Sequence, residues 1–146
     1  MLNLFSTTIR LLIAFACGSL IGLERESKRG PAGLRTHILV CVGSALIMLI
    51  SLYIYDIYEG KAAVDPGRIA AGVVTGIGFL GAGTIMRSSE RVRGLTTAAS
   101  IWVSAAIGLA VGCGYVSGAL IVTVISYFAL SVLKRIEDSQ RRKKSE

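Results

Sequence analysis

Glycine recurs in nearly all the apolar stretches of this chain and is densest within residues 69–86, which contain the string GVVTGIGFLGAG. In water, each glycine inside a helix costs about 0.5–1 kcal/mol relative to alanine. In a bilayer the penalty matters less, because leaving the helix would expose unbonded N–H and C=O groups to hydrocarbon. Glycine there also lets neighbouring helices pack backbone against backbone. The pattern therefore predicts a compact bundle of close-packed membrane helices.

The composition favours an integral membrane protein of one domain. The chain has 146 residues, of which 53% are apolar, whereas a soluble domain of this size needs far more polar surface. A net charge of +7 would suggest nucleic acid in a soluble protein, but here the basic residues lie in short connections and at the C-terminus, as membrane topology requires. Three cysteines without metal-binding spacing indicate buried small side chains. We expect no nucleic-acid partner and no cofactor.

Five segments are long enough, or nearly so, to cross a hydrocarbon core, which takes about 20 apolar residues. They run approximately over residues 4–23, 36–55, 69–86, 95–111 and 115–133. The third and fourth are the shortest and richest in small residues, so we expect them at the centre of the bundle. The predicted organisation is an all-α transmembrane domain over 1–133 and a basic cytoplasmic tail over 134–146.

The Lys and Arg residues predict the orientation of the bundle. The first and third connections and the tail are strongly basic, whereas the second connection is mixed in charge and the fourth has no charged residue. Because basic connections stay on the cytoplasmic side, we expect the N-terminus outside and the C-terminus inside. The tail holds six Lys and Arg residues, which either bind the anionic inner leaflet or serve only as a topology signal.

A faint internal repeat accompanies this alternation. The sequence GLRT at 33–36 is followed 61 positions later by GLTT at 94–97, and Gly22 then aligns with Gly83. Both copies would have the same orientation, as in the parallel repeats of some transporters. The match is explained either by duplication of a two-helix unit or by the abundance of these residue types.

Small residues four apart indicate how the helices pack. The string at 76–81 fits GxGxxG, but it lies inside a predicted membrane helix, so we interpret it as packing rather than dinucleotide binding. Four pairs put two glycines on one helix face, and such pairs either hold the bundle together or form a dimer face. They are Gly18/Gly22, Gly72/Gly76, Gly108/Gly112 and Gly114/Gly118. We expect the third helix to be buried through Gly72, Gly76, Gly78, Gly81 and Gly83.

Polar residues gather at the predicted cytoplasmic rim, where the first helix ends and the second and fourth begin. The candidate site comprises Glu24, Arg25, Glu26, Arg35, Thr36, His37, Thr96 and Thr97, with Ser100 as a further donor. The alternative is a solvated anchor that fixes topology. At the outer side, Asp65 followed by Pro66 predicts an N-cap. Arg10, about two turns from the outer end of the first segment, is expected to snorkel.

No carboxylate lies in the middle of a predicted span, which weighs against a divalent-cation path, and no hydrolytic motif is present. We therefore expect no enzyme activity. Two classes of function remain, namely a regulatory protein that binds other membrane proteins and a small ion transporter or channel.

Three strings together resemble the MgtC/SapB family of bacterial inner-membrane proteins. They are GLERE followed by PAGLRTHILVCVGSAL, then DPGRIAA running into GIGFLGAGTI, then VRGLTTAASIW. The resemblance covers roughly residues 11–114 and implies a five-helix inner-membrane domain linked to magnesium limitation and stress adaptation. It further implies action on partner membrane proteins, including transporters or the ATP synthase, and leaves a homo-oligomer open. Longer members continue into a soluble domain, whereas this chain ends at KRIEDSQRRKKSE.

Overall fold

The computed structural model describes residues 3–28, 30–87 and 92–133, and the predicted basic tail lies outside these ranges. The elements are α1 (Leu4–Ser27), α2 (Leu34–Tyr58), α3 (Pro66–Gly83), β1 (Met86–Arg87), β2 (Val92–Arg93), α4 (Leu95–Cys113), α5 (Val116–Phe128) and a π-helical turn, η1 (Ala129–Leu133). The all-α prediction is confirmed, since the two short strands form only an antiparallel pair with Met86 opposite Arg93. In the described part, α1, α2 and α4 are each long and apolar enough to cross a membrane.

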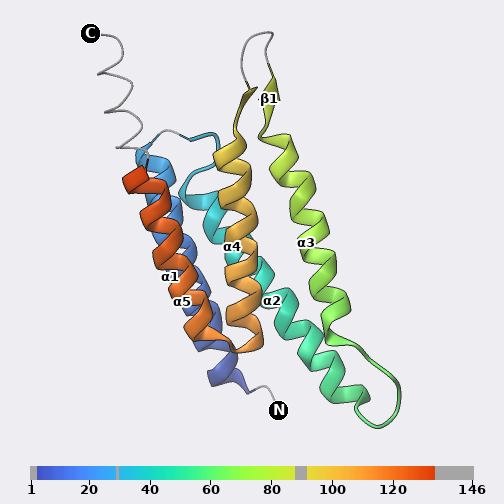
Figure 1. Ribbon diagram of the computed structural model, residues 1–146. Coiled ribbons are helices and arrows are strands. Elements are labelled where there is room, and N and C mark those ends of the chain that lie inside the picture. The colour runs from blue at the N-terminus through green and yellow to red at the C-terminus, as the bar shows by residue number, and fades with distance from the viewer. Residues whose placement is uncertain (1–2, 29, 88–91, 134–146) are drawn as a thin grey trace, which may run out of the picture.

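The helices run up and down, so that connections alternate between two ends (Figure 1). The α1–α2 connection and the two strands lie at one end, which we call the strand end. The start of α1, the α2–α3 connection and the α4–α5 turn lie at the other. Helices α2 and α4 begin 61 residues apart, at Leu34 and Leu95, and each follows a glycine N-cap. This is the spacing of the faint sequence repeat.

The core is built on α2 and α4, which share the most extensive contact of any two helices, followed by α1 with α2. The fully buried apolar side chains of the larger cluster come from α1, α2, α4 and α5: Ala14, Cys17, Ile21, Cys41, Ala45, Ile107, Val111 and Ala119. Most of these are small, so the helices approach closely. The expectation that the fourth segment lies centrally is thus met by the contacts of α4.

Helix α1 packs on α2 through a glycine pair. A Cβ added at Gly18 would lie 2.8 Å from the carbonyl oxygen of His37, and one at Gly22 would lie 2.7 Å from Cα of Leu34. Distances this short leave no room for a side chain, so the two backbones are in direct contact.

Helix α4 uses the same device on another side of α2. A Cβ at Gly108 would lie 2.8 Å from Cβ of Ser44, and one at Gly112 would lie 2.5 Å from the carbonyl oxygen of Ala45. Two of the four predicted glycine pairs, one on α1 and one on α4, therefore pack directly against α2.

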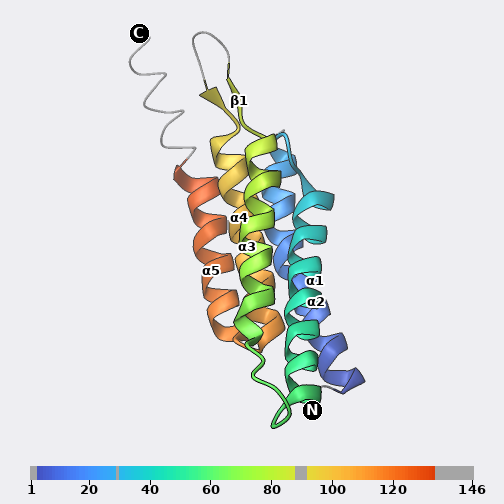
Figure 2. The same cartoon turned by 90° about the vertical axis from the view of Figure 1, so that its right-hand side faces the viewer.

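The prediction that α3 is buried at the centre is wrong. Helix α3 lies at the right-hand edge of the bundle in Figure 1, and in the turned view of Figure 2 it is the helix nearest the viewer, in front of α4. Its buried residues are Val73, Ile77 and Gly81. A Cβ at Gly72, Gly76, Gly78 or Gly83 would meet nothing within 4 Å, and only Gly81 of the predicted set packs, against Ala98 at 3.6 Å. A high density of glycine permits another helix to pack closely, but it does not show which helix does so or whether one does.

Candidate functional site

Three helix termini meet at the strand end and bring polar side chains into the protein interior. The last turns of α1 supply Glu24 and Arg25, the first turn of α2 supplies His37, and the first turns of α4 supply Thr97 and Ser100. We call these five residues the polar cluster. Each is buried, with Glu24 only 5% and Arg25 only 6% exposed. Charged residues are rarely this inaccessible unless they are paired.

Glu24 and Arg25 form a buried but loosely made ion pair. Arg25 Nη1 lies 3.7 Å from Glu24 Oε2, and Arg25 Nη2 donates a long 3.5 Å hydrogen bond to Thr97 Oγ1. Within the described residues, neither carboxylate oxygen of Glu24 nor Nε of Arg25 has a hydrogen-bond partner. Burying such a pair is expensive unless its remaining donors and acceptors are satisfied. Buried carboxylate oxygens without a hydrogen bond are rare in folded proteins, so Glu24 is the strongest candidate for a functional residue in the cluster.

His37 links α2 to α4. Its Nδ1 lies 2.7 Å from the carbonyl oxygen of Gly33, and its Nε2 lies 2.9 Å from Ser100 Oγ. A carbonyl only accepts, so Nδ1 carries a proton and donates to Gly33. Ser100 Oγ also lies 2.9 Å from the carbonyl oxygen of Thr97. A neutral imidazole thus leaves the single hydroxyl proton to serve either Nε2 or Thr97, whereas a doubly protonated ring allows all three bonds.

The other predicted site residues lie outside the polar cluster. Glu26 is exposed, and its Oε2 accepts a 2.8 Å hydrogen bond from the backbone N–H of Leu34, so it caps the start of α2 across the connection. This compensates for the N-cap Gly33, which has no side chain. Arg35 and Thr96 are exposed and Thr36 is half-buried.

Ser104 is a polar residue of this region that the sequence analysis missed. It is fully buried on α4, and its hydroxyl has no hydrogen-bond partner among the described residues. The signal in the sequence is the spacing of Thr97, Ser100 and Ser104, which puts three hydroxyls on one helix face. The described residues contain no group of three or more His, Cys, Asp or Glu side chains that could hold a metal ion.

At the opposite end, Asp65 is the N-cap of α3. Its Oδ1 accepts a 2.8 Å hydrogen bond from the N–H of Gly67, and Pro66 occupies the first turn. This contact is a structural one, remote from the polar cluster.

Comparison with known proteins identifies the family. The family model described as MgtC family matches residues 11–139, which is most of the chain. The chain belongs to the MgtC family. It is thus a membrane protein of that family, and the three strings that resemble MgtC/SapB proteins are accounted for.

Relatives in this family are similar over nearly the whole chain. The YhiD protein of Escherichia coli K12 is 46% identical over 131 residues, covering 88% of this chain and 60% of the relative. The MgtC protein of Salmonella typhimurium LT2 is 45% identical over 138 residues, covering 94% of this chain and 56% of the relative. The chain therefore spans somewhat more than half the length of these relatives. No solved structure matches it.

Proposed function

We propose that this protein is a non-enzymatic MgtC-type protein of the bacterial inner membrane that binds and regulates other membrane proteins during magnesium limitation. The observation that carries the proposal is the buried Glu24 carboxylate, whose oxygens have no hydrogen bond within the described residues. In this proposal the polar cluster is a recognition site that a partner completes.

The packing beneath the cluster supports binding over conduction. Below Glu24 and His37 the core is mostly apolar, with the buried hydroxyls of Ser44 and Ser104 among its side chains, and glycine pairs bring α1 and α4 against the backbone of α2. An ion crossing one protomer would have to pass this closely packed layer, whose few hydroxyls cannot replace a full hydration shell. In this proposal a ligand thus reaches the polar cluster only from the strand end.

The proposed topology has five spans, with the N-terminus outside and the strand end in the cytoplasm. It is supported by the distribution of basic residues between the two ends. The end of α1 with Arg25, the connection with Lys28 and the start of α2 with Arg35 lie at the same end as the strands, which contain Arg87 and Arg93 (Figure 1). An excess of Lys and Arg in short connections is typical of the cytoplasmic side.

The test is complementation in a bacterial strain that lacks this protein and depends on it in low magnesium. We expect Glu24→Gln to abolish rescue of growth while the protein still accumulates in the membrane. Arg35→Gln is the matched control, because Arg35 is exposed at the same end and lies outside the cluster. Full rescue by Glu24→Gln at normal protein level would show that the cluster is only a topology signal.

Magnesium transport is the second candidate, since the name of the YhiD relative proposes that activity for it. An unsatisfied carboxylate at the strand end is also the kind of oxygen ligand that Mg²⁺ binds. Flux into liposomes containing the purified protein separates the two candidates. Magnesium entry above that of empty liposomes, lost in Glu24→Gln, would favour transport, whereas no flux alongside lost complementation would favour regulation.

A further inference from the structure

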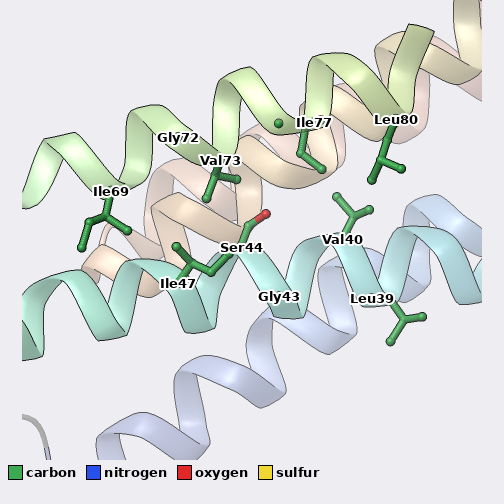
Figure 3. A pocket seen from close by; sticks show the side chains of 11 residues that line it. Leu39, Val40, Gly43, Ser44, Ile47, Ile69, Gly72, Val73, Ile77 and Leu80 are labelled. Atoms are coloured by element: carbon green, nitrogen blue, oxygen red, sulfur yellow. The ribbon is translucent and has the colours of Figure 1, made fainter. Parts of the chain in front are cut away.

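A groove of about 560 Å³ lies between α2 and α3 and is lined by residues of these two helices alone. The lining is almost entirely apolar (Figure 3). Gly43 on α2 and Gly72 and Gly76 on α3 widen the groove, because they have no side chains to fill it. A Cβ at any of these three glycines would meet nothing within 4 Å. The groove thus runs along the apolar middle of two helices and has no occupant within the described residues.

Within this molecule, two pairs of glycines four apart each receive a neighbouring helix. The pairs Gly18/Gly22 and Gly108/Gly112 each contact the backbone of α2. Gly72/Gly76 has the same spacing but faces the groove. The other outer helices present large side chains outward, such as Leu12 and Phe15 of α1 or Ile121 and Ile125 of α5. Helix α3 also exposes large side chains, such as Phe79 and Leu80. Its Gly72 and Gly76, however, leave a strip without side chains that another helix can approach closely.

A hydroxyl inside the groove points in the same direction. Ser44 is only 3% exposed, lines the groove, and has its oxygen directed toward the α3 side (Figure 3). Its hydroxyl makes no hydrogen bond within the described part of the chain. An acyl chain offers no acceptor, whereas a helix that approaches through glycine exposes backbone carbonyls, and Ser hydroxyls bond across helices in membranes.

The face of α3 beside the groove carries the matching projection. Phe79 is 82% exposed and follows Gly72 by seven residues and Gly76 by three, which puts all three on one helix face. It lies at the level of Leu80, which lines the end of the groove. A projection and a hollow at one level on a single surface are what a two-fold symmetric contact needs, because each copy then fills the other.

Charges at the outer end of α3 are also self-complementary. Arg68 lies one turn before Gly72 on the same face, is exposed, and makes no ion pair within the described residues. Asp65, three residues earlier, uses Oδ1 as the helix cap. In a two-fold pair with parallel α3 helices, Arg68 of each copy faces the acidic cap of the other at equal depth.

We propose that the α2–α3 groove is the interface of a homodimer, in which α3 of a second copy packs against Gly72 and Gly76 and Phe79 of each copy enters the groove of the other. The regulatory proposal does not depend on this dimer, and the dimer does not depend on the polar cluster.

The experiment measures association of the full chain in liposomes by energy transfer between donor- and acceptor-labelled copies, over a range of protein-to-lipid ratios. We expect Gly76→Leu and Phe79→Ala each to weaken dimerisation at least tenfold. Gly78→Leu is the matched control, because Gly78 is equally open but lies on the opposite face of α3. Unchanged helix content by circular dichroism would show that the monomer fold is kept.

Several outcomes would overturn the proposal. The wild type remaining monomeric at every ratio would mean that lipid fills the groove. Equal effects of Gly76→Leu and Gly78→Leu would place the contact elsewhere on α3. If Gly76→Leu does not fold, Phe79→Ala decides alone, since it removes an exposed ring, and full dimerisation of Phe79→Ala would refute the interface.

Discussion

Arg10 donates a 2.7 Å hydrogen bond through Nη1 to the carbonyl oxygen of Gly112, a residue 102 positions away. This carbonyl lies in the last turn of α4, where backbone acceptors lack partners within the helix and a positive charge is favoured. Arg10 was expected to snorkel to the interface. It instead fastens the first helix to the end of the fourth, at the end opposite the polar cluster.

Replacing Arg10 with Leu should therefore destabilise the bundle. We expect the free energy of unfolding in mixed micelles to fall by about 1–3 kcal/mol, because a charge-assisted bond to a part-buried carbonyl is lost. Arg35→Leu removes an exposed arginine at the other end of the bundle and should change stability far less. Equal effects of the two substitutions would refute the role assigned to Arg10.

Arg25→Gln should be more damaging than its double mutant with Glu24→Gln. The single change leaves the Glu24 carboxylate buried without its ion-pair partner, which costs about 3–5 kcal/mol. The double change removes both charges and should recover at least half of that loss. A double-mutant cycle of unfolding free energies measures this coupling, and strict additivity would show that the two charges do not interact.

Glu26→Ala should remove the cap of α2 and lower stability by about 1 kcal/mol. Glu26→Gln keeps a side-chain oxygen that can accept from Leu34 N–H, so we expect it to retain most of the stability. Thermal unfolding of the two variants in detergent makes the comparison. If Glu26→Gln lost as much as Glu26→Ala, the negative charge rather than the hydrogen bond would be what matters.

Gly108→Ala and Gly83→Ala should differ sharply, although both add one methyl group to a glycine of a helix. At Gly108 the new Cβ would collide with the backbone of α2, and overpacking of this kind costs about 1–3 kcal/mol. At Gly83 it would meet nothing within 4 Å, so stability should not fall. Folded yield and thermal stability in detergent test this, and similar losses at both sites would contradict the packing described.

The proposed orientation is tested with topology reporters fused after Gly60 and after the last residue. We expect activity typical of the outer side at Gly60 and of the cytoplasm at the C-terminus, because the α2–α3 connection is mixed in charge whereas the strand end is basic. Cytoplasmic activity at Gly60 would refute the proposed orientation.

The sequence alone determined the helical segments and the family, because both depend on local patterns. Apolar length, glycine spacing and the Asp65–Pro66 cap predict helices within a few residues of α1 to α5, and three motifs in order identified the family. It also named Glu24, Arg25, His37 and Thr97, since each lies at a helix end next to a glycine-rich connection.

Only the tertiary structure decided which of these residues face inward. Glu24 and Glu26 are two positions apart, yet one is buried beside Arg25 and the other caps α2 from the surface. Likewise, Gly108 contacts the α2 backbone whereas Gly76 borders an open groove. Glycine spacing specifies a face that permits close approach, but the neighbour that uses it depends on how all five helices pack, which no local pattern encodes.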